Sequence, residues 1–279
     1  MILRLVFFLL AVFTPLLAIG GELVFPADLP MRNKAWNYHR ARELLRTTDY
    51  RDVPLTLVTR AQWKARKITE PYEPIGEIKG IVIHQSETPE TTTLRSIQEY
   101  HQTVKKWADI GYHFVIAQFP NAKGKLEWRV FEARPLSAKG AHAGRMDGVD
   151  LNPGQIGICL MGDFDQPGTH KHRDAFGRAV WDGENFPPAN FSSSEPEAFA
   201  PELKPYFELQ ADPRAVYLLG QLVEKLYGTY GSQIKEILGH GAGDHAIFPG
   251  HKSCPGEGSY HLVEALRSRY GMDNVDRTR

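Results

Sequence analysis

The chain has 279 residues, of which 42% are apolar and 24% are charged, a balance that is ordinary for a globular protein. Its 33 lysine and arginine residues are matched by 33 aspartate and glutamate residues. Binding to phosphate backbones requires surplus positive charge, so this composition argues against a nucleic-acid partner. The length accommodates one large domain or two small ones.

The first twenty residues have the pattern of a secretory signal peptide. Arg4 is their only charged residue, an apolar run from Leu5 to Ile19 follows it, and small residues come next at Gly20 and Gly21. The run is short for a bilayer span, although an uncleaved membrane anchor is the alternative. We therefore expect residues 1–20 to be removed, leaving no stable membrane span and a periplasmic or secreted bacterial protein.

Two further segments differ from the rest of the chain in amino-acid composition and periodicity. Residues 21–52 are polar and predict an N-terminal extension, with one helix around Trp36–Arg46. Residues 165–210 contain many Pro, Ser, His and charged residues without a sustained period, which is typical of an insertion or a functional loop. The main domain is expected at residues 53–272, with this insertion inside it.

Within the main domain, predicted strands alternate with predicted helices. Short β-branched and apolar runs predict strands at 79–84, 112–118, 126–132, 155–161 and 234–238. Apolar residues at helical spacing predict helices at 94–104, after an N-cap in Thr91–Thr93, from Pro213 onward, and at 260–269. The alternation predicts an α/β fold with a central mixed sheet flanked by helices.

Three potential metal ligands lie at or after predicted strands. His84 ends one apolar strand, His240 follows another, and Cys254 comes fourteen residues after His240. Two imidazoles and one thiolate suit zinc, and three protein ligands leave a fourth position for water, as a hydrolytic zinc requires. Widely spaced ligands carry no local signature, so spacing alone does not establish this site.

From Val53 to about Tyr270 the chain contains a series of short motifs in a fixed order. They are Leu57–Trp63 (LVTRAQW), Ile81–His84 with the following Thr88, Tyr100–His101, Asp109–Phe114 (DIGYHF), Ala141–His142, Ile156–Asp163 (IGICLMGD), Gly239–His240 and Lys252–Gly256 (KSCPG). In order and approximate spacing this set resembles the zinc-dependent N-acetylmuramoyl-L-alanine amidases of type 2, which include phage amidase lysozymes and peptidoglycan-recognition proteins.

The resemblance implies a role for each matching residue and a peptidoglycan-recognition-protein-like amidase fold. It implies zinc ligands at His84, His240 and Cys254, catalytic residues at Tyr112 and Lys252, and substrate-binding residues at His142 and Thr88. The implied reaction is hydrolysis of the amide between N-acetylmuramic acid and L-alanine, with peptidoglycan or muropeptides as partners. A monomer is expected.

Several alternatives stay open at this stage. The gap between His240 and Cys254 is longer than usual in the family and contains His245, which is a second candidate ligand. Cys159 lies in an apolar strand and is expected to be a buried thiol, with a disulfide to Cys254 as the alternative. Tyr112 has the alternative role of a core aromatic residue.

Two alternative functions also stay open. The first is a module that binds peptidoglycan without cutting it, although every implied ligand is present in this chain. The second is an amidase that acts on anhydro-muropeptide fragments rather than on the intact wall.

Overall fold

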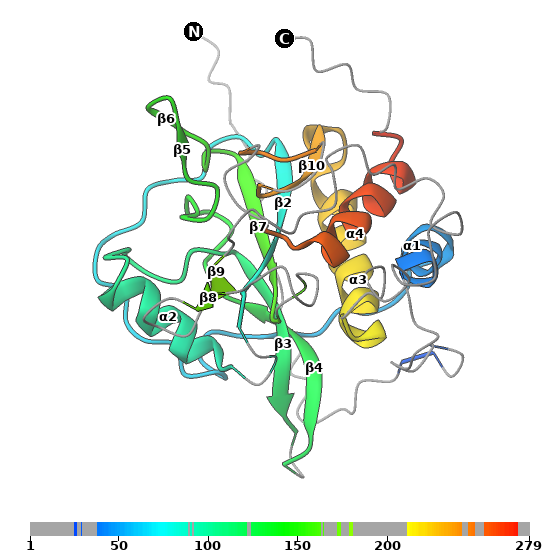
Figure 1. Cartoon of the computed structure of the whole chain (residues 1–279), viewed down its shortest axis with the longest axis horizontal. Coiled ribbons are helices and arrows are strands. Elements are labelled where there is room, and N and C mark those ends of the chain that lie inside the picture. Colours follow the sequence, from blue (N-terminus) through cyan, green and yellow to red (C-terminus); the bar gives the residue numbers. More distant parts are fainter. Residues whose placement is uncertain are drawn as a thin grey trace, which may run out of the picture.

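The computed structural model describes residues 25–26, 29, 38–88, 90, 92–121, 124–162, 164, 172–173, 179–180, 211–241, 245–248 and 254–272. A six-stranded mixed sheet in the order β1-β4-β3-β7-β2-β10 forms its centre (Figure 1). The strands are β1 (Leu57–Val58), β2 (Gly80–Gln85), β3 (Phe114–Pro120), β4 (Leu126–Glu132), β7 (Gln155–Leu160) and β10 (Glu236–Gly239). The β3–β4 pair is antiparallel, and the other neighbours in this sheet are parallel.

Helices cover both faces of the sheet. They are α1 (Tyr38–Thr47), α2 (Leu94–Thr103), α3 (Pro213–Tyr230) and α4 (Glu257–Arg269), with a short 3₁₀ turn, η3, at Gly231–Gln233. Figure 1 shows α1, α3 and α4 together on one side of the sheet and α2 on the opposite side. Two small antiparallel pairs lie outside the sheet: β5 (Arg145–Met146) with β6 (Val149–Asp150), and β8 (His172–Arg173) with β9 (Ala179–Val180).

The alternation of side chains along β2 decides which face receives its histidine. Ile81 and Ile83 pack into the apolar core beneath α3 and α4. Successive side chains of a strand point to opposite faces, so His84 points to the other face, the one on which α2 lies. Every residue of β2 is buried, as expected for a strand in the middle of a largely parallel sheet.

The predicted α/β class and its mixed sheet are confirmed, and most predicted elements agree with the observed ones to within two or three residues. The Thr93 hydroxyl accepts a hydrogen bond from the Ser96 amide and caps α2, as the sequence suggested. Several short elements were not expected: the two-residue strand β1, the β5–β6 hairpin, the β8–β9 pair and the 3₁₀ turn η3. Most of the expected insertion at 165–210 lies outside the described residues.

The N-terminal helix α1, expected in a separate extension, packs against the last helix. The Arg269 guanidinium of α4 donates hydrogen bonds to the carbonyl oxygens of Leu45 and Thr48, at 2.9 and 2.8 Å. These carbonyls lie at the C-terminal end of α1, where helices leave acceptors without helical partners. A domain boundary near residue 53 stays a prediction.

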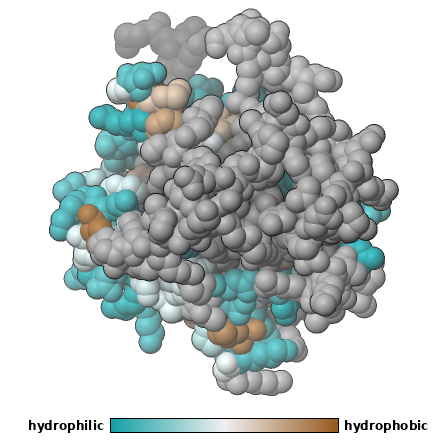
Figure 2. Space-filling model, in the orientation of Figure 1, coloured by the Kyte–Doolittle hydropathy of each residue, from teal (hydrophilic) through white to brown (hydrophobic). Residues whose placement is uncertain are grey.

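Among the coloured residues visible in Figure 2, small hydrophobic areas lie among hydrophilic ones. Isolated exposed apolar residues are ordinary on protein surfaces and do not mark a site by themselves. In the part of the chain that the structure describes, no helix combines the length and the apolar character needed to cross a membrane.

Candidate metal centre

The register of two neighbouring strands brings the two candidate histidine ligands together. Strands β2 and β10 are parallel, and Gly239 at the end of β10 is paired with Ile83. The next residue on each strand is therefore His240 and His84, and their ring centroids are 4.8 Å apart. His84 and His240 are far apart in the sequence, and the parallel pairing of β2 with β10 brings them together in space.

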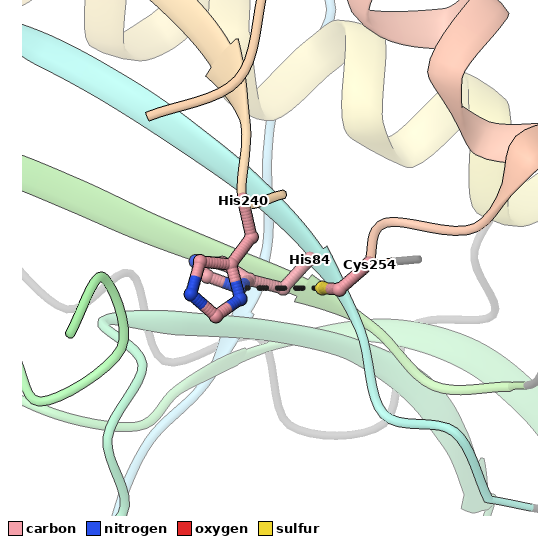
Figure 3. Close-up of side chains that lie close together, drawn as sticks. All are labelled: His84, His240 and Cys254. Carbon is pink, nitrogen blue, oxygen red and sulfur yellow. Dashed lines mark hydrogen bonds between the residues drawn. The ribbon is translucent and has the colours of Figure 1, made fainter. Parts of the chain in front are cut away.

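Cys254 completes the group from the segment that precedes α4 (Figure 3). Its Sγ lies 3.6 Å from His84 Nδ1, and one ligand atom each of His84, His240 and Cys254 lie within 4.8 Å of one another. The three side chains are 1%, 8% and 4% exposed, respectively. Two imidazoles and a thiol thus converge in a buried position.

This donor set fits zinc in kind and in size. Zinc bonds of about 2.0–2.3 Å place tetrahedral ligand atoms roughly 3.3–3.8 Å apart. The 3.6 Å separation of Cys254 Sγ and His84 Nδ1 already lies in this range. The ligand atoms of all three residues lie within 4.8 Å of one another, so the widest separation must shorten by about one ångström for zinc to bind. Side-chain rotation can supply such a shift, so the residues present fit the group.

Within the long gap between His240 and Cys254, the described residues around Ala246 pair in parallel with Gly239 at the end of β10. Gly239 donates its amide hydrogen to His245 O and accepts one from Ile247 N, each at 2.8 Å. Gly241 N donates to Cys254 O at 2.7 Å, which holds the two ends of the gap together. Among the described residues, the ligand group contains His240 and not His245.

Tyr112 stands beside the candidate centre just before β3. Its ring centroid lies 5.1 Å from that of His84, and its carbonyl accepts a hydrogen bond from Arg134 N. Burial raises the pKa of Tyr112 well above its usual value of 10, and the nearby Cys159 and Cys254 thiols add to the rise. The phenol is therefore protonated at neutral pH and can act as a hydrogen-bond donor.

Cys159 is a buried free thiol, as is Cys254. Cys159 is paired with His84 across β2 and β7, so both side chains lie on the same face of the sheet. Burial raises the pKa of the Cys159 thiol. In this arrangement Cys159 packs in the apolar cluster on the α2 face, next to Tyr112, and forms no disulfide.

His142 contacts the first candidate ligand directly. Its Nδ1 is 3.0 Å from His84 Nε2, and its Nε2 is 3.2 Å from Gln155 O. Burial, followed by the charge of nearby His113, lowers the pKa of His142 well below 6.5, so its ring is neutral. This residue, which sequence comparison suggested as a substrate contact, also lines a cleft beside the centre.

The remaining sequence-predicted residues are placed less fully. The Thr88 hydroxyl lies 2.7 Å from Ser86 Oγ and donates to Met161 Sδ at 3.4 Å, at the end of β2. Lys252 lies outside the described residues, so its role stays a prediction. Glu87 has a left-handed backbone, with φ of 53°, and its charge contributes to the raised pKa of Tyr112.

A cleft of about 520 Å³ borders the centre at His142 and His240. The sequence did not single out Trp107, Lys105 or Arg145, which also line this cleft. Other charged groups there include Lys139, which bridges Glu73 and Asp150 at 2.7 and 2.9 Å. Ligand sites are usually concave clefts of about this size, so this cleft is a candidate binding site.

Comparison with known proteins identifies the family. The family model described as N-acetylmuramoyl-L-alanine amidase matches residues 74–257, more than half of the chain. The chain belongs to this amidase family. Membership confirms the type-2 amidase relationship and the amidase fold that the sequence motifs implied.

Individual relatives of this amidase-family chain are distant. Peptidoglycan-recognition protein SC2 of Drosophila simulans is 30% identical over 117 residues, covering 39% of the chain and 56% of the relative. Peptidoglycan-recognition protein SD of the same species is 28% identical over 134 residues, covering 43% and 61%. The chain thus spans little more than half the length of these curated relatives.

One solved structure covers most of this amidase-family chain. The crystal structure of Drosophila peptidoglycan recognition protein SD covers 76% of the chain and 94% of its own, with 22% identity and a TM-score of 0.46.

Proposed function

We propose that this chain is a zinc-dependent amidase that hydrolyses the amide between N-acetylmuramic acid and L-alanine in peptidoglycan. The observation that carries the proposal is the convergence of His84, His240 and Cys254 in one buried group within a chain of the amidase family. A binding module that cuts nothing would not require this group. A three-ligand set leaves room for the reacting molecules, as in catalytic rather than structural zinc sites.

Each residue of the proposed centre has a distinct task. When bound, zinc lowers the pKa of water and polarises a carbonyl group. His84, His240 and Cys254 would hold the ion beside the cleft. Tyr112 keeps its phenolic proton and donates a hydrogen bond to the oxygen that gains charge as the amide is attacked. Lys252, by its position in the family motif, supplies positive charge to the same oxygen.

The cleft is the proposed site for the stem peptide of the substrate. Stem peptides carry carboxylates, and the cationic side chains of Lys105 and Arg145 line this cleft. The indole of Trp107 offers an apolar surface in the same place, which suits the methyl groups of alanine and lactyl units. Thr88 and His142 are retained as candidate substrate contacts.

The proposed location follows from the first twenty residues. We propose export by the signal peptide at residues 1–20, to the periplasm or the medium of a bacterium, where the wall is accessible. The mature chain is proposed to act as a monomer, with residues 53–272 as the amidase domain.

The test is digestion of intact peptidoglycan and of anhydro-muropeptides in parallel, followed by mass spectrometry of the products. We expect free stem peptides that begin with L-alanine, loss of this release with a chelator, and recovery when zinc is restored. His84→Ala is expected to abolish release, whereas His39→Ala, on the exposed side of α1, is the matched control. Binding of peptidoglycan by the zinc-loaded chain without any release would identify a recognition module instead. Release from only one of the two substrates would decide between intact wall and fragments.

A further inference from the structure

The imidazole of His142 connects a candidate metal ligand to the backbone of β7. Two hydrogen bonds make the connection, from His84 Nε2 to His142 Nδ1 at 3.0 Å and from His142 Nε2 to Gln155 O at 3.2 Å. The rings of His84 and His142 are nearly perpendicular, at 84°, with centroids 5.0 Å apart. His84, His142 and the Gln155 carbonyl thus form a buried hydrogen-bonded chain that ends at the candidate metal centre.

The chemistry of the last acceptor fixes the direction of every hydrogen bond in this hydrogen-bonded chain. A backbone carbonyl only accepts, so His142 Nε2 carries the proton and donates to Gln155 O. In a neutral imidazole with its proton on Nε2, the lone pair is on Nδ1, so His142 accepts at Nδ1 from His84. His84 must therefore donate from Nε2, which leaves the lone pair of the neutral imidazole on Nδ1.

That lone pair is on the atom that faces the other ligands. His84 Nδ1 is the ring nitrogen that lies 3.6 Å from Cys254 Sγ. With the opposite tautomer, Nδ1 would carry a proton and could not bind a cation. The hydrogen bond that His84 Nε2 donates to His142 Nδ1 thus selects the only neutral form of His84 that can serve as a ligand through Nδ1.

The surroundings hold the His142 ring in one place. Asn152 Oδ1 accepts hydrogen bonds from the amides of His142 and Ala143, at 2.7 and 2.9 Å, which fixes the backbone. The ring lies against Gly140 and Gly157, and a Cβ atom at Gly157 would come within 2.6 Å of it. Larger residues at these two positions would displace the ring, so the site is built around this imidazole.

We propose that His142 is a positioning residue that sets the tautomer and the orientation of His84 for metal binding. This inference rests on the proposed zinc centre and deepens it. It gives His142 a task different from the substrate contact that family resemblance implies. Both ring nitrogens are already engaged and the residue is only 5% exposed, so the positioning task uses the ring nitrogens and leaves only the rest of the residue to the cleft.

The first experiment measures zinc affinity by competition with a chromophoric chelator. His142→Leu removes the acceptor, and we expect its affinity to fall roughly 10- to 100-fold, the usual loss when the partner of a ligating histidine is removed. His142→Asn places an amide oxygen near the former Nδ1, and we expect it to recover most of the loss. Equal affinity of His142→Leu and the wild-type chain would overturn the inference, as would equal loss in the Leu and Asn variants.

The second experiment reads the tautomer directly in the metal-free wild-type chain by nitrogen-15 NMR of labelled histidines. We expect His84 to be protonated at Nε2 and unprotonated at Nδ1, and His142 to be protonated at Nε2. A proton on His84 Nδ1 would overturn the inference, and this result does not depend on whether a variant folds. If the wild-type chain binds no zinc, the proposed function fails, while the NMR result still decides the role of His142.

Discussion

Gly241 donates its amide hydrogen to the carbonyl oxygen of Cys254 across a distance of 2.7 Å, although twelve residues separate them in the sequence. This hydrogen bond fixes the residue after His240 against the third candidate ligand. The loop between them can therefore be long without moving the two ligands apart. His245 lies within that loop and pairs through its backbone with Gly239.

The first prediction separates the two histidines of this segment. His240→Ala is expected to remove one of three zinc ligands and to reduce zinc affinity and amide hydrolysis by at least roughly 100-fold. His245→Ala is expected to change both by less than about threefold. Competition with a chelator and release of stem peptides measure the two effects. Similar losses in both variants would show that the ligand assignment in this loop is wrong.

The second prediction concerns the Tyr112 hydroxyl. Tyr112→Phe keeps the aromatic ring that packs against His84 and removes only the proposed donor. Loss of one donor to a developing oxyanion typically reduces kcat by about 10²- to 10³-fold, and we expect a decrease of this size with little change in zinc affinity. Steady-state kinetics on a soluble muropeptide provides the measurement. Unchanged kcat would leave Tyr112 as a core aromatic residue.

The sequence predicted the parts of this molecule that depend on local patterns. The apolar runs around Ile81 and Ile156 gave the positions of β2 and β7, because buried parallel strands are almost continuously apolar. The β5–β6 hairpin was missed, although Asp147 and Gly148, both with positive φ, have a common two-residue turn sequence. That local signal could have been found.

The contact between His84 and His142 could not be predicted in the same way. These residues are 58 positions apart, and no period or motif encodes a hydrogen bond between two imidazoles. It arises because the His142 ring packs over Gly157 of β7, the strand paired with β2, which is an outcome of tertiary packing. Family resemblance supplied the identity of both residues but not the connection between them.

The third prediction concerns a buried ion pair near the start of β3. The Asp109 carboxylate is fully buried, lies 2.9 Å from Arg60 Nη2, and accepts hydrogen bonds from Tyr72 and Gln98. Asp109→Ala leaves these donors without their acceptor, so we expect the free energy of unfolding to fall by about 3–5 kcal/mol. Urea denaturation followed by circular dichroism measures it.

The matched control for this substitution is Asp49→Ala. Asp49 also pairs with an arginine, Arg51, at 2.6 Å, but both side chains are well exposed to solvent. Exposed pairs contribute little because water and salt screen the charges, so this variant should unfold close to the wild-type midpoint. A loss at Asp109 no larger than that at Asp49 would contradict the role assigned to the buried pair.

The fourth prediction is acid sensitivity of the metal-free fold, to which the buried histidines His101 and His113 contribute. Burial lowers the pKa of His101 to about 3 and that of His113 to about 4, from an ordinary value of 6.5. In the folded chain both rings stay neutral at pH 5, where the unfolded chain binds a proton on each. The unfolded state therefore gains protons first, and stability falls as the pH decreases from 6.5 toward 4.

Each of the two histidines contributes a slope of up to about 1.4 kcal/mol per pH unit within this window, and the stability they provide is fully present above pH 6.5. Urea denaturation of the metal-free chain at pH 7.5, 6 and 5 measures the slope. His101→Gln, which cannot gain a proton, is expected to lower stability at pH 7.5, because Gly111 N loses its acceptor, and to flatten the pH dependence. A slope identical to that of the wild-type chain would show that the His101 ring is not the source of the acid sensitivity.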